Sequence, residues 1–207
     1  MKLLIATTNI GKIHEFETLL ENTGYAITTP SKEGIKINVV ENEETFKGNA
    51  RLKAEAFSNA TGLLSLADDS GLEVDALNGE PGVRTARYAG DDATDVERQI
   101  YLLEKMKTVP IPQRGATFHC VIAIAEAGRP TTYATGNVRG IISTDIKGSK
   151  GFGYDPIFFI PELNKRLSEL STHEKNAISH RGIAAQSARL LLQGRERPDP
   201  NNPENAT

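Results

Sequence analysis

The chain has 207 residues, of which 38% are hydrophobic and 25% charged, a composition typical of a globular protein with a buried core. Its net charge of −3 argues against a nucleic-acid partner, although a local basic pocket for phosphates is compatible with it. The single cysteine, Cys120, forms no disulfide framework and is expected in the core. No apolar segment approaches the roughly 18 residues that span a bilayer, and MKLLIATTN has no secretory signal. We therefore expect a cytoplasmic protein with no membrane partner.

The apolar periodicity predicts alternating strands and helices in the first half of the chain. In order, the expected elements are a strand over 2–6, a helix over about 11–22, strands over 25–29 and 35–40, a helix over about 43–60, and a strand over 63–67 that runs into an acidic turn.

In the second half, Thr94 and Glu97 predict a capping box that opens a helix to about Lys107. The other expected features are an irregular loop over 80–93, a long β-hairpin joined at 127–130, a last helix over about 179–193 and a disordered tail over 194–207. Because strands and helices alternate before a hairpin follows, we expect an elongated α/β fold with a mixed β-sheet and flanking helices, in a single domain over 1–193.

The segment TTNIGK lies between the first predicted strand and helix, where backbone N–H groups and the helix dipole favour an anion. A cation such as Lys12 is unfavourable in a first turn unless an anion pairs with it. The segment differs from the P-loop pattern, and the alternative is that Asn9 caps the helix while Lys12 is solvated. The candidate phosphate-binding residues are Thr7, Thr8, Asn9, Ile10, Gly11 and Lys12.

Acidic residues suggest a metal site. Asp68 and Asp69 follow an apolar strand, and ligand groups of α/β proteins gather at the carboxyl ends of strands. Carboxylate oxygens suit Mg²⁺ or Mn²⁺, although Asp-Ser-Gly is also common turn chemistry. Glu41 precedes the second helix, where the dipole alone accounts for an acid. Lys53 lies near that helix's buried stripe, where it must snorkel or meet a partner such as a phosphate or the Asp pair.

The stretch GFGYDPIFF, residues 151–159, has the composition of a site for a flat ligand. Its glycines allow the backbone to approach closely, and Phe152 or Tyr154 can stack on an aromatic base. Asp155 can accept hydrogen bonds from ring N–H groups. The alternative is that the aromatic residues belong to the core and that Gly and Pro shape a turn.

Further cations follow in HEKNAISHRG. His180 and Arg181 lie near the start of the last predicted helix, where a helix prefers anions. Arg181 can contact a carbonyl or phosphate through its planar fork, and Lys175 can act as a point charge. Together with the preceding clusters, these residues indicate a site for a nucleoside phosphate.

These clusters resemble the motifs of the inosine/xanthosine triphosphate pyrophosphatase family, also called Ham1-like. The resemblance covers nearly the whole chain and is carried, in order, by ATTNIGKIHE, TFKGNARLKA, LADDSGLEVDAL, PGVRTARYAG, GFGYDPIFF and EKNAISHRG. It implies hydrolysis of deaminated purine nucleoside triphosphates (ITP, dITP, XTP) to the monophosphate and pyrophosphate. It also implies an elongated mixed α/β fold with a cleft between two lobes, Mg²⁺ or Mn²⁺ as the cofactor, and a homodimer.

Position by position, the resemblance implies that Asp69 is the general base and a metal ligand. Glu41 corresponds to a second metal position, and Lys53 to a catalytic lysine that handles the phosphates. Residues 7–12 correspond to the phosphate-binding loop. The remaining implied substrate contacts are Ser70, Phe152, Gly153, Tyr154, Asp155, Lys175, His180 and Arg181.

The chain departs from the family pattern at Thr8, where glycine is usual, at Gly48, where an acid is common, and at Ser149 and Lys150, where small residues are usual. None of these departures removes a matched catalytic position. Two other functions compete with the implied one. The first is a metal-dependent pyrophosphatase for another modified nucleotide, and the second is a non-catalytic nucleotide sensor, which would not need the two implied metal ligands.

Overall fold

The computed structural model describes residues 1–195, so most of the predicted tail, 196–207, lies outside the described residues. One mixed sheet organises the chain. Its strands are β1 Lys2–Ile5, β2 Ala26–Thr28, β3 Leu64–Val74, β4 Gly115–Ala125, β5 Thr132–Ile142, β6 Phe158–Ile160 and β7 Lys165–Arg166.

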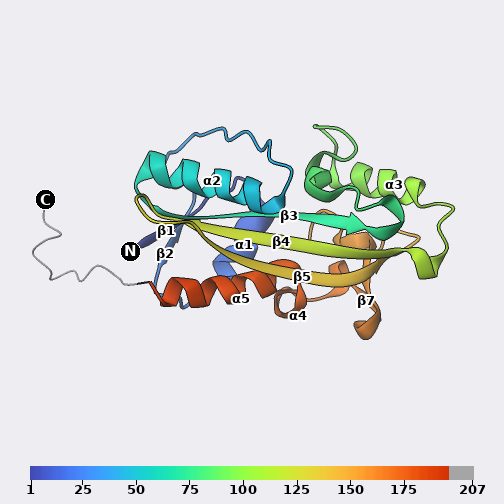
Figure 1. Cartoon of the computed structure of the whole chain (residues 1–207). Helices are drawn as coiled ribbons and strands as arrows, with labels where there is room; N and C mark the ends of the chain where they lie inside the picture. Colours follow the sequence, from blue (N-terminus) through green and yellow to red (C-terminus); the bar gives the residue numbers. More distant parts are fainter. Residues whose placement is uncertain (196–207) are drawn as a thin grey trace, which may run out of the picture.

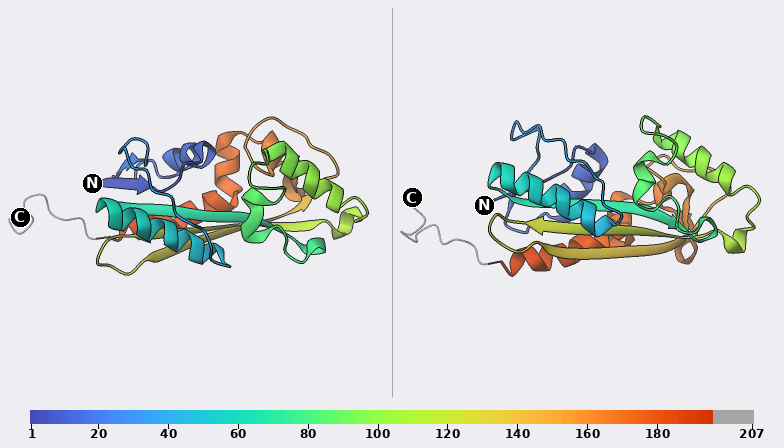
Figure 2. Two further views of the ribbon diagram at one scale, coloured as in Figure 1. Left: turned by 90° about the horizontal axis from the view of Figure 1, so that it is seen from above. Right: turned by 45° about the horizontal axis from the view of Figure 1, so that its top comes forward.

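The spatial order of the sheet is β2-β1-β3-β4-β5-β6-β7. β1 pairs in parallel with β2 and β3, whereas the remaining neighbours pair antiparallel. This confirms the predicted mixed sheet, and β4 and β5 form the predicted long hairpin. The three long strands β3, β4 and β5 give the molecule its elongated form (Figures 1 and 2). The division into two lobes stays a prediction.

Helices cover both faces of the sheet. They are α1 Ile10–Leu19, α2 Phe46–Thr61, α3 Asp95–Lys105, α4 Thr172–Ile178 and α5 His180–Gln193. Figure 1 shows α2 on one face of the long strands, α5 on the other, and α3 at the end away from the N-terminus. The capping box of Thr94 and Glu97 is present at the start of α3, as predicted. None of the helices within residues 1–195 is long and apolar enough to cross a membrane.

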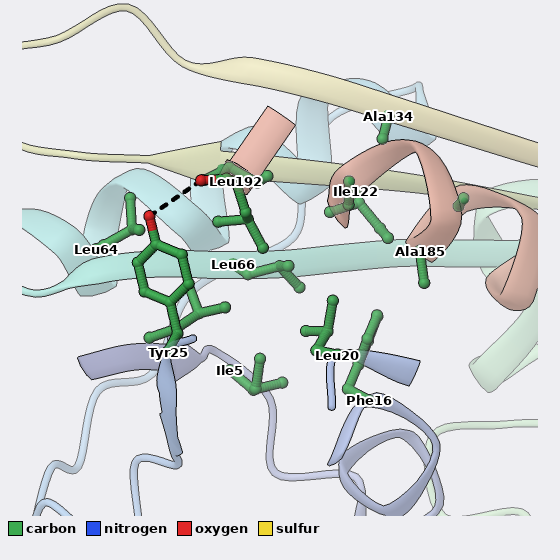
Figure 3. Close-up of a cluster of buried hydrophobic side chains, with 14 of the residues drawn as sticks. Ile5, Phe16, Leu20, Tyr25, Leu64, Leu66, Ile122, Ala134, Ala185 and Leu192 are labelled. Carbon is green, nitrogen blue, oxygen red and sulfur yellow. Dashed lines mark hydrogen bonds between the residues drawn. The ribbon is translucent and has the colours of Figure 1, made fainter. Parts of the chain in front are cut away.

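One core lies between the sheet and helices α1 and α5 (Figure 3). Phe16 and Leu20, at the C-terminal part of α1, pack there with Leu66 of β3. The Tyr25 hydroxyl donates to the carbonyl of Leu192 over 3.2 Å. This hydrogen bond joins the chain just before β2 to the end of α5.

Two further cores complete the interior. The one towards α3 includes Leu72, Leu102, Met106, Phe118, Ile157 and Phe158. The one beneath α2 includes Leu4, Ala50, Ala54, Phe57, Ala67 and Ala123. β3 contributes residues to all three cores, so the polar residues in its middle are held by packing at both ends and on both faces.

The predicted strand over 35–40 is wrong. Ile35, Ile37 and Val39 do pack against the core beneath α2, which explains the alternating pattern. Within the described residues, however, no strand pairs with this segment, and it remains irregular. Alternation therefore reports burial of every second side chain here, without a hydrogen-bonded ladder.

The predicted acidic turn after residue 67 is also wrong. β3 continues through Asp68 and Asp69 to Val74, because these residues pair in register with Ile122 and Val121 of β4. The acidic pair thus occupies the middle of a central strand. Its two carboxyl groups project to opposite faces of the sheet, since successive strand residues alternate.

Candidate active site

A cleft of about 430 Å³ opens where the β1–α1 loop, α2, β3 and the loop before β6 meet. The predicted site residues that line it are Thr7, Thr8, Asn9, Lys12, Glu41, Lys53, Asp69, Ser70, Phe152, Gly153, Tyr154, Asp155, Lys175, His180 and Arg181. Ile10 and Gly11 do not line the cleft. The Ile10 side chain is 70% exposed, and Gly11 packs against the Phe152 ring, whose Cδ1 would lie 2.7 Å from a Cβ at position 11.

The β1–α1 loop is shaped by its own side chains. Asn9 is the N-cap of α1, and its Oδ1 accepts the Lys12 N–H over 3.1 Å. The Thr7 hydroxyl accepts the Asn9 N–H over 3.2 Å. The capping role proposed for Asn9 is therefore confirmed. The alternative that Lys12 is solvated is wrong, because the Lys12 Nζ lies 3.0 Å from Oδ2 of Asp68.

Asp68 anchors the cations on the α1 and α5 face of β3. Its Oδ2 also lies 3.1 Å from Nη2 of Arg181 and accepts the Ser70 hydroxyl over 3.1 Å. Burial raises the pKa of this carboxyl, but Lys12 and Arg181 outweigh burial and hold the pKa of Asp68 well below its usual range. Asp68 is therefore a permanent anion whose charge is neutralised inside the protein.

Asp69 faces α2 in a different environment. Its Oδ1 lies 3.4 Å from Lys53 Nζ, and its Oδ2 accepts the Asn49 side-chain amide over 3.3 Å. Lys53 Nζ also lies 2.7 Å from Glu41 Oε2, so this lysine meets carboxylate partners rather than snorkelling. Burial raises the pKa of Asp69 and outweighs the charges of Lys53 and Lys12, with the Glu41 charge adding to the increase.

The carboxylates of Glu41 and Asp69 converge on one lysine, Lys53, at the edge of the cleft. Within residues 1–195, no three His, Cys, Asp or Glu side chains form a preassembled metal cage. Mg²⁺ is commonly held by one or two carboxylates together with phosphate oxygens and waters. The pair therefore fits a hard divalent cation that a bound polyphosphate helps to coordinate.

Glu15 of α1 links Lys175 of α4 to Arg181 of α5. Its Oε1 lies 2.7 Å from Lys175 Nζ and its Oε2 lies 2.6 Å from Arg181 Nη1. Lys175 Nζ also lies 2.5 Å from Oδ2 of Asp155. Burial raises the pKa of Glu15, but Arg181 and Lys175 lower it below its ordinary value. The buried ion-pair chain that results runs through Asp155, Lys175, Glu15, Arg181, Asp68 and Lys12.

The two aromatic residues of GFGYD have different surroundings. The ring of Phe152 lies 4.9 Å from Lys175 Nζ and 5.5 Å from Arg181 Cζ, and it lines the cleft. Tyr154 is only 1% exposed, packs in the core towards α3, and donates its hydroxyl to the Thr85 carbonyl over 3.1 Å. The alternative that the aromatic residues of this stretch belong to the core is therefore correct for Tyr154. Phe152 is the better candidate for stacking on a base.

His180 is buried at the first position of α5, with Ser179 as its N-cap. Its ring stacks on Phe118, with centroids 4.6 Å apart and planes inclined by 9°. Burial lowers the pKa of His180, and the nearby charges of Arg181 and Lys175 lower it further, well below the usual range. His180 is therefore neutral at pH 7, so it adds no charge to the helix start.

Four residues at or near the cleft escape sequence reasoning: Glu15, Asn49, Asp95 and Gln99. Glu15 is a buried acid next to Phe16 on the apolar side of α1, and its distance of three residues from Lys12 is the available signal. Asn49 is buried inside α2, where asparagine is a poor helix former. Asp95 and Gln99 lie in α3 and contact Gly153, a residue distant in the sequence.

The fold and the cleft define an α/β protein with a site for a phosphorylated ligand that carries a flat ring. The comparisons narrow this class. The Ham1 family model matches residues 3–190, and the chain belongs to the Ham1 family.

Individual relatives match over most of their length. The chain is 45% identical to the dITP/XTP pyrophosphatase of Desulforamulus reducens, covering 93% of this chain and 96% of that protein. It is 46% identical to the dITP/XTP pyrophosphatase of Escherichia coli, covering 92% and 96%. The solved structure of the Staphylococcus aureus Ham1 protein matches with a TM-score of 0.85 and 39% identity, covering 95% of this chain and 100% of that one.

Proposed function

We propose that this protein hydrolyses ITP, dITP and XTP to the nucleoside monophosphate and pyrophosphate, which removes deaminated purines before their incorporation into DNA or RNA. The observation that carries the proposal is Asp69, a buried carboxyl with a raised pKa that shares one cleft with Lys12 and Lys53. Relatives that are 45% and 46% identical over more than nine tenths of the chain are named for dITP and XTP.

In the proposed reaction a water attacks the α-phosphorus, and the bond from that phosphorus to the oxygen bridging to the β-phosphate breaks. Asp69 orients the water and takes its proton, because a carboxylate whose pKa is raised is a stronger base than an ordinary one. Lys12 and Lys53 then hold the negative charge that develops on the leaving pyrophosphate. The N–H groups of residues 7–12 supply further donors to the phosphates.

Asp69 and Glu41 are the residues that would hold Mg²⁺ or Mn²⁺. Such an ion, when bound, neutralises the polyphosphate and lowers the pKa of water. Lys53 contacts both carboxylates, at 2.7 Å from Glu41 Oε2 and 3.4 Å from Asp69 Oδ1. It is therefore poised to exchange carboxylate oxygens for phosphate oxygens when the substrate enters.

The other end of the cleft is proposed to select the base. Phe152 stacks on the purine, and backbone N–H groups of the loop or Arg181 donate to the 6-keto oxygen of hypoxanthine or xanthine. Adenine presents an amino group there, which leaves a buried donor unpaired at a cost of about 1–3 kcal/mol for each mismatch. Two such mismatches are enough to discriminate against ATP by a factor of hundreds.

We further propose that the enzyme is cytoplasmic, that residues 1–193 form its single domain, and that it works as a homodimer. The negative net charge supports a small-molecule substrate rather than nucleic acid. Light scattering coupled to gel filtration measures the assembly directly. A mass of twice the chain mass supports the dimer, and a monomer at working concentration rejects it.

Product analysis is the first test of the reaction. ITP and ATP are incubated with the protein in Mg²⁺ or in chelator, and the nucleotides are separated by chromatography. We expect Mg²⁺-dependent formation of IMP and pyrophosphate, with ATP almost untouched. Formation of IDP and orthophosphate would instead place the attack at the γ-phosphorus and reject the mechanism.

Substitution of Asp69 separates an enzyme from a nucleotide sensor. Asp69→Asn keeps the shape and removes the base, so kcat for ITP should fall by about 10²-fold or more, while ITP binding by calorimetry is retained. The matched control is Asp92→Asn, the same change at an exposed position, which should leave both values as in the wild type. A sensor would show no turnover in either protein.

A further inference from the structure

Helix α3 holds both hydrogen-bonding groups of Gly153. The Gly153 N–H donates to Asp95 Oδ2 over 2.6 Å, and its carbonyl accepts from Gln99 Nε2 over 2.5 Å. Asp95 and Gln99 are four residues apart and so lie on one face of the helix. Gly153 has a φ of 61°, and a Cβ there would meet no atom within 4 Å. The glycine is therefore needed for its backbone conformation, which α3 fixes from both sides.

Gln99 is an unusual choice for its position if packing is its only role. Its side chain is 2% exposed, and its Oε1 has no hydrogen-bond partner within residues 1–195. Because a carbonyl oxygen only accepts hydrogen bonds, the Gly153 carbonyl requires the Nε2 side of the amide to face it. An apolar side chain would fill the same volume without burying an unpaired oxygen. The contribution specific to glutamine is therefore its hydrogen bond to the Gly153 carbonyl.

Asp95 is itself held in place by Arg98. The Arg98 guanidinium contacts Asp95 Oδ1 and donates to the carbonyls of Ala86 and Ala93. Ala86 belongs to the 3₁₀ helix Gly82–Arg87, which lines another wall of the cleft. The start of α3 therefore connects two walls of the cleft through one set of side chains.

The neighbours of Gly153, Phe152 and Asp155, line the cleft and are the groups proposed to face the purine ring. Phe152 precedes it, with its ring over Lys175 and Arg181. Asp155 follows two residues later, pairs with Lys175, and accepts the Phe152 N–H over 2.9 Å. A rotation of the Gly153 peptide would move this loop relative to the cations beneath it.

We propose that Gln99 and Asp95 are positioning residues for base recognition: they orient the loop over 152–155 through the Gly153 peptide and so set the preference for a 6-keto purine. This inference rests on the proposed function, because it assumes that the loop reads a purine. The hydrogen bonds of Asp95 and Gln99 go to Arg98 and Gly153 rather than to Lys12 or Lys53, so we expect the phosphate end of the cleft to change less than the base end.

Two compounds that each represent one part of the proposed substrate, IMP and inorganic tripolyphosphate, test the proposal by calorimetry. IMP carries the base, is already a product of the proposed reaction, and reports on the loop, whereas inorganic tripolyphosphate reports on the phosphate end alone. In Gln99→Met, which keeps the length of the side chain and removes the donor, the Kd for IMP should rise about tenfold, as expected for one buried hydrogen bond. The ratio of IMP to AMP affinity should fall, and the Kd for tripolyphosphate should change less than about twofold.

Two further variants sharpen the result. Gln99→Glu keeps the shape of the side chain but places an acceptor against the Gly153 carbonyl, so it should weaken IMP binding at least as much as Gln99→Met does. Gln113→Met, the same chemical change at an exposed position, should leave all affinities unchanged. The double variant Asp95→Ala/Gln99→Met should lose less free energy of IMP binding than the sum of the losses in the two single variants, because both side chains act on one peptide group.

The inference is overturned if the Kd for IMP is the same in Gln99→Met and in the wild type. It is also overturned if the Kd for tripolyphosphate rises in the same proportion as the Kd for IMP, because that result would indicate general damage to the fold. A wild-type protein that binds tripolyphosphate but not IMP also overturns it. Because the readout is binding rather than turnover, failure of ITP hydrolysis in the wild type would reject the proposed function and leave this comparison intact.

Discussion

At the scale of single residues, Asp68 and Asp69 are chain neighbours whose carboxyl groups have opposite pKa shifts. The two cations that flank Asp68, Lys12 and Arg181, outweigh burial and lower the pKa of that carboxyl. Asp69 is buried beside Lys53 with a further carboxylate nearby, and its pKa is raised. The pleat of β3 is the physical cause, since it sends the two side chains to different faces and so to different neighbours.

His180 makes stability depend on pH. Its pKa in the folded protein is depressed, whereas an unfolded histidine titrates near about 6.5. As pH falls below that value, the unfolded state binds a proton that the folded state does not, so the free energy of unfolding decreases, with a slope approaching about 1.4 kcal/mol per pH unit. Urea unfolding at pH values from 7.5 to 5 measures this slope.

His180→Asn should flatten the slope below pH 6.5, because the buried titrating group is gone. The control is His14→Asn, at a side chain that is 72% exposed, which should retain the wild-type slope. Equal slopes in His180→Asn and the wild type would mean that other groups dominate the acid destabilisation.

At the scale of elements, β3 and the 3₁₀ helix Gly82–Arg87 lie in close contact at Gly71. A Cβ at Gly71 would lie 2.5 Å from the Gly82 carbonyl oxygen and 2.6 Å from Thr85 Oγ1. Thr85 Oγ1 also accepts the Leu72 N–H over 2.9 Å. The absence of a side chain at Gly71 therefore allows this wall of the cleft to dock on the strand.

Gly71→Ala should push the 3₁₀ helix away from β3. We expect a loss of about 1–3 kcal/mol in the free energy of unfolding, as for other overpacked sites, together with a reduced kcat/KM for ITP because the cleft wall moves. Urea unfolding and steady-state kinetics measure the two effects. In the control Gly194→Ala, the added Cβ would be 3.4 Å from the Leu190 carbonyl oxygen, an ordinary contact, so both values should match the wild type.

The elements were predicted correctly where the side-chain pattern matches the backbone hydrogen bonding, and incorrectly where the two differ. The hairpin of β4 and β5 and the capping box before α3 were predicted because their signals are local. The segment 35–40 alternates like a strand but finds no ladder partner among the described residues. Asp68 and Asp69 look like turn residues, yet β4 pairs with them across the sheet, and local patterns contain no information about that partner.

At the scale of the whole molecule, the buried ion-pair chain joins α1, β3, α4 and α5 across the cleft. Glu15 lies at its centre, bound to Lys175 and Arg181. Removing one partner of a buried ion pair leaves uncompensated charge, which typically costs 3–5 kcal/mol. Since both cations keep a second carboxylate, we expect the lower end of that range for Glu15.

Glu15→Gln should therefore lower the free energy of unfolding by about 3 kcal/mol and weaken IMP binding, because Lys175 and Arg181 lose the shared anion that offsets their mutual repulsion and holds both in place. Urea unfolding at pH 7.5 measures the first effect. Glu17→Gln, two positions along α1 and partly exposed, is the matched control and should change stability by less than about 0.5 kcal/mol. Equal effects of both substitutions would contradict the structural role of the chain.

The candidate site was predictable in part for a related reason. Three cations stand at helix positions that are unfavourable for a positive charge or that face the protein interior, and each has a carboxylate partner in the structure. They are Lys12, Lys53 and Arg181. The identity of those partners was not predictable, because Glu15 meets Arg181 across 166 residues of sequence. Gln99 carries no local anomaly at all, and its role appears only when α3 and the loop at Gly153 are seen together.

The pleat of β3 also matters for anyone who engineers this protein. Positions 68 and 69 are adjacent in the sequence, yet we expect substitutions at Asp68 to act mainly through its buried ion pairs with Lys12 and Arg181, and substitutions at Asp69 to act mainly on turnover. A library scored only by activity merges the two into a single intolerant stretch. Scoring abundance separately would resolve them, and would leave position 69 as the place to introduce a catalytically silent receptor for modified nucleotides.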